Sequence, residues 1–385
     1  MKKICMITTV SGTMESFVVE IAKHVHHTCG YDVTLICDHD EAFANSLPEY
    51  LHYIPVKMER GINLSGFASI KKFRRIFRRE NFDLVQYATP NASCYASIAA
   101  KRERVPVRLY CQWGIRYVGL HGITKWVFKQ IEKNICKLST HIHCASHGNM
   151  QFAIREHLYS SEKASVVGNG GTIGVDLNEY NIAEKAMWRT EIRSKYNLTD
   201  SDFVFGFAGR ISVDKGCNEL IAAFRAVSQA VPSAKLLIVG PFEDNCGLQD
   251  EWLSFAKASD RVVFTGRVAK GDMRKFYAAM DVLVHPTYRE GFGMVIQEAG
   301  ALAVPVITTK IPGASEVMKD GVSCMLVEPK NAEALSCAME SIYLSPAKAL
   351  SIGEDARQRT ESLYERSVML EQQRKEYVKL LSLKQ

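Results

Sequence analysis

Several features that define other protein classes are absent from this sequence. It has 11 cysteines but no C-x-x-C pair, which argues against a zinc ribbon or a thioredoxin-like redox site. No stretch approaches 18 uncharged apolar residues, so no membrane-spanning helix is predicted. There is no internal repeat and no low-complexity tract. An ordinary globular protein remains, and its scattered cysteines favour a compartment where thiols stay reduced.

No secretory leader is predicted at the start of the sequence. The segment MKKICMITTV has two lysines and a short apolar run that stops at Ser11-Gly12, where a turn is expected. A signal peptide needs a longer apolar region and a cleavage site of small residues. We therefore interpret Ile4–Thr8 as a first β-strand and expect a cytoplasmic protein.

Length and charge are more informative. A chain of 385 residues predicts two or three domains, and 47% apolar with 23% charged residues is typical of soluble proteins. Residues 1–180 hold 22 Lys and Arg against 16 Asp and Glu, whereas residues 181–385 hold 26 of each. The whole net charge of +6 therefore lies in the first half. Its partner is expected to be negative: nucleic acid, a membrane surface or a phosphorylated substrate.

Short apolar runs alternate with helical segments in both halves, which predicts two parallel sheets with crossover helices. The strands expected in the first half are Ile4–Thr8, Val33–Cys37, Leu84–Tyr87, Val107–Cys111, His141–Ala145 and Ser165–Val167. Those expected in the second half are Phe203–Ala208, Lys235–Val239, Val262–Thr265, Val282–His285, Val306–Thr308 and Met325–Val327. The expected helices include Glu15–His27, Cys217–Ala230, Lys270–Ala279, Met294–Ala301 and most of 332–385.

The fold class is therefore α/β, with two Rossmann-like, doubly wound domains that face each other across a cleft. We place the domains at residues 1–178 and 179–361, and expect the helix from about 362 to 385 to pack back on the first domain. In such sheets ligands bind at the carboxyl ends of the strands, so the cleft is the expected site.

The segment EGFGMVIQE, residues 290–298, follows a strand and opens a helix. Its glycines let the backbone approach a ligand, and the helix N-terminus attracts an anion or hydroxyl groups. Glu290 and Glu298 would stand about 12 Å apart on a helix, which suits two ends of one long ligand. The alternative is a helix-capping Glu with a solvated Glu.

A second segment, FAGRISVDKG at residues 207–216, also joins a strand to a helix. Arg210 can bind a diphosphate bidentately, and Lys215 adds a point charge. The alternative is a solvated basic turn, but two such segments at strand ends favour a shared phosphate site.

Together these residues resemble the donor site of retaining nucleotide-sugar glycosyltransferases of family 4, which have the GT-B fold. The resemblance extends over nearly the whole chain and is strongest to the bacterial capsule and O-antigen subgroup, in the stretches GIRYVGLHG and GNGGTIGVD. It implies transfer of a sugar from a nucleotide-sugar, usually a UDP-sugar, with no cofactor and no metal.

The resemblance also implies roles for individual residues. Arg210, Lys215 and Glu290 would be catalytic: the two cations stabilise the leaving diphosphate, and Glu290 holds hydroxyl groups of the sugar. The remaining donor-binding residues would be Gly12, Gly209, Val268, Gly291, Phe292, Gly293, Met294 and Glu298. Of these, Glu298 would bind the ribose and Val268 would lie near the base. Front-face displacement needs no protein nucleophile.

The sequence departs from the family at one point in the first domain. Many relatives have a His-Gly motif at a strand end, where this chain has Trp113-Gly114. We expect Gln112, Trp113 and Thr13 to contact the acceptor or the sugar. His121, His141, His143 and His147 are expected to be structural.

Two other motifs predict no further ligand. Asp38-His39-Asp40 is a D-x-D sequence, but acids after the second strand of such a domain often face solvent, so no metal is predicted. The run from Gly168 to Gly174 fails the dinucleotide spacing because Ile173 stands where the last glycine should be.

The densest charge cluster is IKKFRRIFRR, residues 70–79, which has basic and apolar faces at helical spacing. Such a helix can lie on an anionic membrane, or it can pack its phenylalanines into the first domain. The expected partners are thus a nucleotide-sugar, a glycan acceptor of the undecaprenyl-diphosphate type and an anionic membrane surface at which the enzyme is peripheral. Nucleic acid is not expected because binding modules and stacking motifs are missing. A nucleotide-sugar epimerase and a non-catalytic binding module remain alternatives.

Overall fold

The structure is a computed structural model that describes residues 1–58, 66–244 and 246–382. The chain forms two compact units. Unit 1 contains residues 1–173 and the segment from Ser367 onward, and unit 2 contains Gly174–Arg366. The sequence places these boundaries at 178/179 and near 362. Within the described ranges, no helix combines the length and the apolar character needed to cross a bilayer.

Unit 1 is built on a sheet of seven parallel strands in the order β3-β2-β1-β4-β5-β6-β7. The strands are β1 (Lys3–Ile7), β2 (Asp32–Cys37), β3 (Leu51–Pro55), β4 (Leu84–Tyr87), β5 (Val107–Gln112), β6 (His141–Cys144) and β7 (Ala164–Val166). The helices are α1 (Ser11–Phe17), α2 (Val19–Cys29), α3 (Glu41–Ser46), α4 (Gly66–Glu80), α5 (Pro90–Arg102), α6 (Gly122–Leu138), α7 (His147–Arg155) and α16 (Arg366–Ser382). The strand order reverses between β1 and β4, so ligands are expected at that edge.

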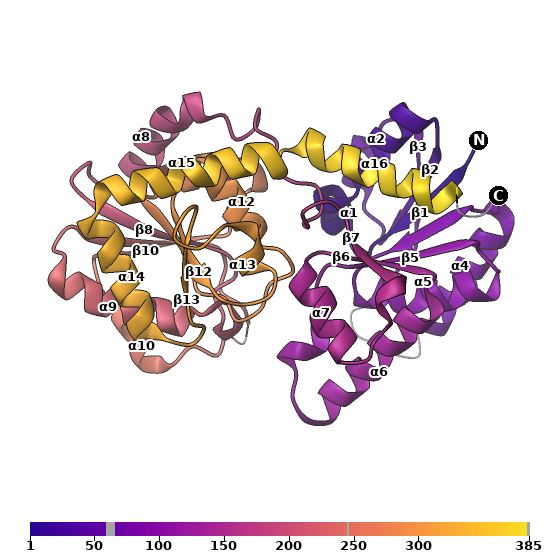
Figure 1. Cartoon of the computed structure of the whole chain (residues 1–385), viewed down its shortest axis with the longest axis horizontal. Helices are drawn as coiled ribbons and strands as arrows, with labels where there is room; N and C mark the ends of the chain where they lie inside the picture. Colours follow the sequence, from indigo (N-terminus) through magenta and orange to yellow (C-terminus); the bar gives the residue numbers. More distant parts are fainter. Residues whose placement is uncertain (59–65, 245, 383–385) are drawn as a thin grey trace. The chain divides into compact units, whose positions relative to one another are not determined.

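The helices of unit 1 cover both faces of the sheet (Figure 1). One apolar core lies beneath α4, α5, α6 and α7, and the other lies beneath α1, α2, α3 and α16. Helix α16 returns from the far end of the sequence to complete the second core. Its Tyr377 is fully buried and donates a hydrogen bond to Gln86 of β4.

Unit 2 repeats the plan with six parallel strands in the order β10-β9-β8-β11-β12-β13. The strands are β8 (Phe203–Ala208), β9 (Ala234–Val239), β10 (Val262–Gly266), β11 (Val282–His285), β12 (Val306–Thr309) and β13 (Met325–Val327). The helices are α8 (Lys185–Lys195), α9 (Cys217–Ala230), α10 (Asp250–Ala258), α11 (Met273–Ala279), α12 (Met294–Ala301), α13 (Ala314–Val317), α14 (Ala332–Leu344) and α15 (Pro346–Leu363). Here the strand order reverses between β8 and β11.

These two sheets confirm the predicted fold class, and the predicted bounds of α9 and α12 are confirmed to the residue. Two expectations in the first half were wrong. The turn expected at Ser11-Gly12 is already the first turn of α1. The single helix expected over 15–27 is broken at Val18, whose φ of −126° departs from the helical value and separates α1 from α2.

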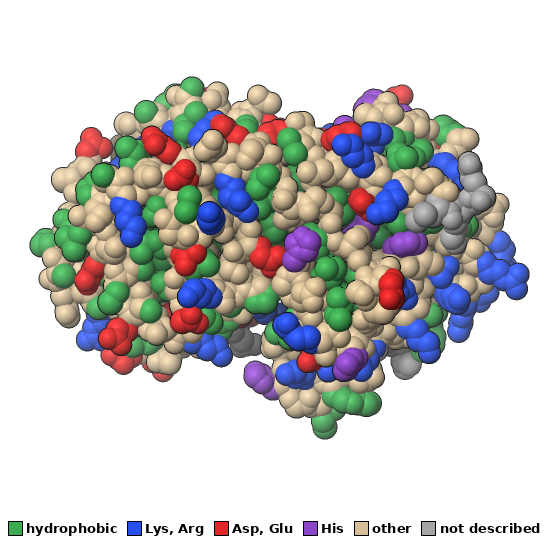
Figure 2. Space-filling model, in the orientation of Figure 1, with side chains coloured by type: hydrophobic (Ala, Val, Ile, Leu, Met, Phe, Trp, Pro, Cys, Tyr) green, Lys and Arg blue, Asp and Glu red, His purple; other side chains and the backbone are tan. Residues whose placement is uncertain are grey.

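The basic segment 70–79 lies in α4 and packs its apolar face inward. Phe73, Ile76 and Phe77 are buried in the core of unit 1. The charged face is exposed, and Figure 2 shows Lys and Arg side chains gathered over α4 at the right-hand edge of the view. Glu103 partly neutralises this face because it accepts hydrogen bonds from Arg74 and Arg78. Helix α4 therefore presents charge, and Phe73 and Phe77 are not available to a membrane, whereas Phe67 in its first turn is 70% exposed.

Candidate functional site

The site in unit 2 is built from two loops that leave neighbouring strands. One loop follows β8 and contains a short 3-10 turn, Val213–Lys215, and the other follows β11 and leads into α12. The amide of Tyr288 donates to the carbonyl of Asp214 at 2.9 Å, which joins the two loops. Gly216 permits this approach: its φ is +71°, and an added Cβ would lie 2.0 Å from the carbonyl oxygen of Pro286. The two loops thus meet at the strand reversal, where α/β sheets bind ligands.

Lys215 and Glu290 are in direct contact at this position. The Lys215 Nζ donates to Glu290 Oε2 at 2.8 Å, and both side chains are largely buried, at 17% and 20% exposure. His285, at the end of β11, places its Nε2 at 3.3 Å from the same oxygen. The other oxygen, Oε1, accepts from the amide of Gly291 at 3.2 Å. The carboxylate is therefore held by three groups from both loops.

The surroundings keep Glu290 negatively charged. Burial on its own would raise the pKa of Glu290, but the hydrogen bond from His285 and the positive charge of Lys215 bring that pKa well below its usual value. Burial also lowers the pKa of His285, so its imidazole is neutral near pH 7. A neutral His285 that donates through Nε2 orients the carboxylate and adds no charge of its own.

Arg210 lies in the same loop as Lys215 but pairs with other acids. Its guanidinium donates to Glu243, which follows β9, and its Nη2 lies 3.6 Å from Asp214 Oδ2. Asp214 also accepts from Arg289 at 3.0 Å. Arg210 is about half exposed, so it stands at the rim of the site, in a chain of alternating charges. The structure brings Lys215 and Glu290 into contact, whereas Arg210 joins the cluster through Asp214.

The second acid of the motif, Glu298, lies on α12 in a more apolar environment. Its Oε2 accepts from the hydroxyl of Tyr277 at 2.7 Å. Burial raises the pKa of Glu298, and the hydrogen bonds from Tyr277 and Tyr180 oppose this only in part. The two glutamates of the motif therefore differ: the surroundings of Glu290 lower its pKa, whereas those of Glu298 raise its pKa. Val268 lies in the loop after β10 and is half-buried.

The backbone between the two acids is tightly packed. Gly293 caps α12 with φ of +66°, and Phe292 is buried against Tyr364 with ring centroids 5.4 Å apart. Gly313 faces this loop, and a Cβ there would lie 2.5 Å from the carbonyl oxygen of Gly291. Gly291 and Met294 complete the turn, and Gly209 directly follows the neighbouring strand β8. This packing holds the helix N-terminus in a fixed position.

In unit 1, Gly12 and Thr13 lie in the first turn of α1, next to the carboxyl end of β1. Gly12 is exposed, and no atom lies within 4 Å of a Cβ added there. Ser11 fixes this turn by donating to Asp40 Oδ2 at 2.6 Å. Asp40 also caps α3 by accepting from the amide of Phe43, so the second acid of the D-x-D sequence is used by the fold.

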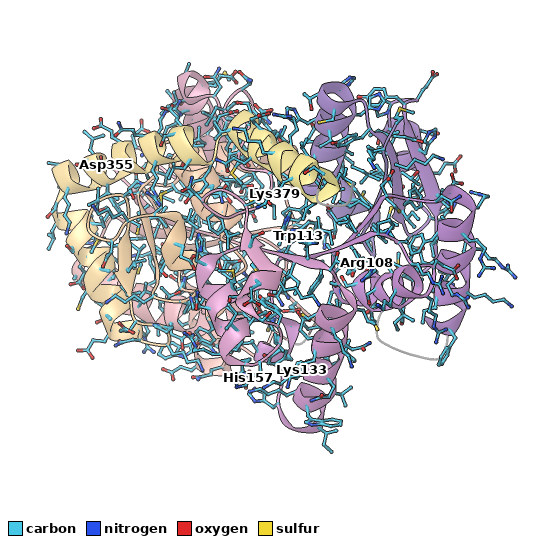
Figure 3. All side chains as sticks on the ribbon, turned by 45° about the vertical axis from the view of Figure 1, so that its right-hand side comes forward. Arg108, Trp113, Lys133, His157, Asp355 and Lys379 are labelled. Carbon is cyan, nitrogen blue, oxygen red and sulfur yellow. The ribbon has the colours of Figure 1, made fainter. Side chains whose placement is uncertain are left out.

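Gln112 and Trp113 stand at the end of β5 in different surroundings. Gln112 is completely buried: its Nε2 donates to Glu132 at 2.6 Å, and its Oε1 accepts from Tyr159 at 2.8 Å. Trp113 is half-buried, 5.3 Å from the ring of Phe17, and lines a small pocket of unit 1 (Figure 3). Gln112 thus serves a buried hydrogen-bond network, and Trp113 is the more accessible of the two.

Sequence reasoning missed His285 and the buried Glu132. A histidine at the end of an apolar strand resembles a core residue. The one feature of the sequence that could have indicated a role for His285 is its position five residues before Glu290. Of the four histidines considered in the first half, His143 is buried on β6 and His121 is exposed at the start of α6. Among residues 1–58, 66–244 and 246–382, no three His, Cys, Asp or Glu side chains form a metal-binding group.

Solved structures share this architecture over the full length. The structure of HepE from Anabaena in complex with UDP and glucose superposes with a TM-score of 0.79 at 21% identity, covering 100% of both chains. WaaG, described as a glycosyltransferase involved in lipopolysaccharide biosynthesis, gives a TM-score of 0.73 at 14% identity and covers 97% of this chain and 98% of its own. At these identities the likeness concerns the fold alone. Two Rossmann-like units, the second of which has ligand-site loops after β8 and β11, define the GT-B class.

Sequence comparisons identify the family. The pattern described as "Glycosyl transferases group 1" matches residues 189–359, and "Glycosyltransferase Family 4" matches residues 14–172. The capsular polysaccharide biosynthesis glycosyltransferase CapM of Staphylococcus aureus is 30% identical over 84% of this chain and 83% of its own length. A UDP-Gal:alpha-D-GlcNAc-diphosphoundecaprenol alpha-1,3-galactosyltransferase of Escherichia coli is 22% identical over 84% and 82%. The chain therefore belongs to glycosyltransferase family 4, which confirms the predicted resemblance.

Proposed function

We propose that this chain is a retaining glycosyltransferase that moves a sugar from a UDP-sugar to a lipid-diphosphate-linked glycan during assembly of a bacterial surface polysaccharide. The observation that carries the proposal is the Lys215–Glu290 contact at the strand reversal of unit 2. It places a cation for a diphosphate beside an anion for sugar hydroxyl groups, and these are the two parts of a nucleotide-sugar that transfer must separate.

Lys215 can serve the diphosphate without leaving Glu290. An ammonium group has three N–H donors, and the structure uses one of them for Glu290 Oε2. The others can donate to phosphate oxygens, and Arg210 at the rim adds a second cation. The N-terminus of α12 contributes backbone N–H groups. Charge that develops on the departing diphosphate is then met by fixed donors, which is the main means of rate enhancement in such sites.

In the proposed reaction the bond between the anomeric carbon and the β-phosphate oxygen breaks. A bond from the acceptor oxygen to the same carbon forms on the same face of the sugar. The acceptor proton passes to the departing phosphate, so no protein nucleophile or external base is required. Glu290 holds a sugar hydroxyl group, and Glu298 holds the ribose, with Val268 beside the base. We propose no metal and no cofactor, because the cations and the helix N-terminus neutralise the phosphates.

The acceptor class is supported by the relatives rather than by a described site. CapM is named for capsular polysaccharide biosynthesis, and the E. coli relative is named for transfer onto a diphosphoundecaprenol-linked sugar. The net positive charge of the first half suits an acceptor with a diphosphate. We therefore place the enzyme at the cytoplasmic surface of a membrane that carries such lipids.

The test has two stages. A panel of UDP-sugars is first titrated calorimetrically against the protein, and the best donor is then incubated with diphosphate-linked acceptors of the polyprenyl type. Transfer with the donor's anomeric configuration kept, as observed by NMR, supports the proposal, and inversion of that configuration contradicts it. A rearranged nucleotide-sugar formed without acceptor would indicate an epimerase instead. Binding with no turnover of any pair would indicate a non-catalytic module.

Variants of the site complete the test. Lys215→Met and Glu290→Gln should each abolish transfer, whereas Lys310→Met should leave it unchanged. Lys310 is a suitable control because it forms an exposed ion pair with Glu328 at 3.4 Å in the same unit. Full activity in either site variant would refute the site assignment.

A further inference from the structure

An exposed apolar surface lies at the tip of α6 in unit 1. Ile123 and Trp126 are 82% and 63% exposed, and Val127 and Val118 are also exposed. Ile123, Trp126 and Val127 follow the i, i+3, i+4 spacing of one helix face. We call these four side chains, with Arg116 and Lys125, the tip surface. Figure 2 shows hydrophobic side chains together with Lys, Arg and His at the lower edge of unit 1, where α6 begins.

The tip surface is held rigidly by the rest of the unit. Further along α6, Ile135 and Cys136 are buried in the core. The guanidinium of Arg116 lies 4.9 Å from the ring centre of Phe128, and Lys129 donates to Glu156 of the next segment at 2.6 Å. The first turns of α6 extend beyond Lys133 at the edge of the unit (Figure 3). The apolar side chains are thus presented by a supported helix.

The charge around the tip surface is mainly positive, and an acid that lies beside it, Glu156, pairs with Lys129. From Arg104 to Arg155 the only acidic residue is Glu132, and Glu132 is buried in the hydrogen-bond network of Gln112. The same span holds eight Lys and Arg residues, which are Arg104, Arg108, Arg116, Lys125, Lys129, Lys133, Lys137 and Arg155. Exposed apolar side chains with a cationic border match the headgroup region of an anionic bilayer, where tryptophan is also favoured.

We propose that the tip surface inserts into the headgroup region of an anionic lipid bilayer and so holds unit 1 at the membrane. This inference deepens the proposed function, because a lipid-linked acceptor has to be met at a bilayer. The segment that carries the tip surface begins directly after β5, at the strand-end edge where the acceptor is expected. Insertion of the tip would therefore bring this edge close to the lipid headgroups. Helix α4 adds long-range attraction through its charged face, and of its three phenylalanines Phe73 and Phe77 are buried and Phe67 is exposed.

The test compares variants of the full chain in co-sedimentation with vesicles of phosphatidylglycerol and phosphatidylcholine in equal parts, and with phosphatidylcholine alone. The double variant Ile123→Ser, Trp126→Ser should bind the anionic vesicles at least about tenfold more weakly than the wild type. The control is Leu344→Ser, Leu350→Ser, which removes two side chains of 74% and 64% exposure from unit 2 and should bind like the wild type. Lys125→Ser should weaken binding to the anionic vesicles about fivefold, and this difference from the wild type should become smaller at high salt.

Tryptophan fluorescence reports insertion directly. Anionic vesicles should shift the emission of the wild type to shorter wavelength, and the shift should be lost in Trp126→Phe. The proposal is overturned if the wild type does not bind vesicles, or if the double variant binds as tightly as the wild type. It is also overturned if sedimentation velocity shows a wild-type dimer that the double variant abolishes, because the surface then belongs to a second copy.

Failure of this inference and failure of the proposed function can be told apart. The tip variants should keep full transfer to a water-soluble, short-chain acceptor, since Ile123 and Trp126 are not among the residues assigned to the donor or the acceptor. Loss of vesicle binding with transfer intact supports both proposals. Vesicle binding that depends on Trp126, in a protein with no transferase activity, would sustain this inference and refute the function.

Discussion

Lys215 and Glu290 are 75 positions apart in the sequence, yet a 2.8 Å hydrogen bond joins them at the strand reversal of unit 2. Each charge is buried enough to need the other, because an unpaired buried ion is costly. The pair therefore stabilises the loops as well as preparing the site. A change at either residue should be visible both in stability and in catalysis.

A double-mutant cycle measures this coupling. Lys215→Met and Glu290→Gln should each lower the free energy of unfolding by about 2 kcal/mol, because each leaves the partner without its ion pair. The double variant should lose less than the sum. Urea denaturation of the wild type, the two single variants and the double variant gives the coupling energy. The same cycle at the exposed Lys310–Glu328 pair should give no measurable coupling energy. Strict additivity at Lys215 and Glu290 would contradict the pairing.

His285 should affect the pH dependence of the site through Glu290. The folded-state pKa of Glu290 lies below its unfolded value, so its contribution to stability is present above about pH 4.5 and is lost as the pH falls through the folded-state pKa. Replacing His285 by Leu removes a donor, which raises the pKa of Glu290 and moves the acid limb of activity to higher pH. His285→Gln keeps an N–H donor and should move that limb much less. Identical pH–rate profiles for both variants would refute this role.

Gly216→Ala should disrupt the contact between the two loops. The new Cβ would meet the carbonyl of Pro286, and the left-handed backbone at this position adds strain. We expect a loss of at least about 2 kcal/mol in unfolding free energy together with loss of donor binding. Gly271→Ala is the matched control, because nothing lies within 4 Å of its added Cβ. Calorimetric titration with UDP and thermal melts of both variants test this expectation. Equal melting temperatures for Gly216→Ala and Gly271→Ala would contradict the assigned contact between the loops.

The buried Glu132 should give unit 1 a pH-dependent stability of the opposite sign. Burial raises the pKa of Glu132, so its ionised form is disfavoured in the folded state. Its contribution to stability is largest at low pH and decreases as the pH rises through the folded-state pKa. The melting temperature of Glu132→Gln should therefore improve relative to the wild type between pH 5 and pH 8. Glu156→Gln should show no such trend between pH 5 and pH 8, because the hydrogen bond from Lys129 lowers the pKa of Glu156 and confines its pH-dependent contribution to below about pH 4.5.

Much of the fold could be predicted because buried parallel strands are continuous apolar runs. Val33–Cys37 and Phe203–Ala208 are of this kind, and glycines at 216 and 293 mark where α9 and α12 begin. Strand β3 was missed. It lies at the edge of its sheet, where His52 is exposed and Pro55 ends the run, so its sequence has little of the buried-strand pattern.

The site was predictable as a set of loops but not as a set of contacts. Two strand-to-helix turns with Lys215 and Glu290 indicated a common ligand, since parallel strands end at one edge. The pairing of Arg210 with Glu243 depends on a loop from a third strand, which no local pattern reveals. The amphipathic pattern of α4 could not distinguish a helix buried on one face from one on a membrane, because both have the same spacing.

Helix α16 has a consequence for how the chain is made. Its Tyr377, Leu380 and Leu381 belong to the core of unit 1, although all of unit 2 is translated before them. On the ribosome, unit 2 can reach its native state as a continuous segment while unit 1 still lacks part of its interior. The domain that begins first is thus the one that finishes folding last, and until then its unfinished apolar face needs protection by chaperones.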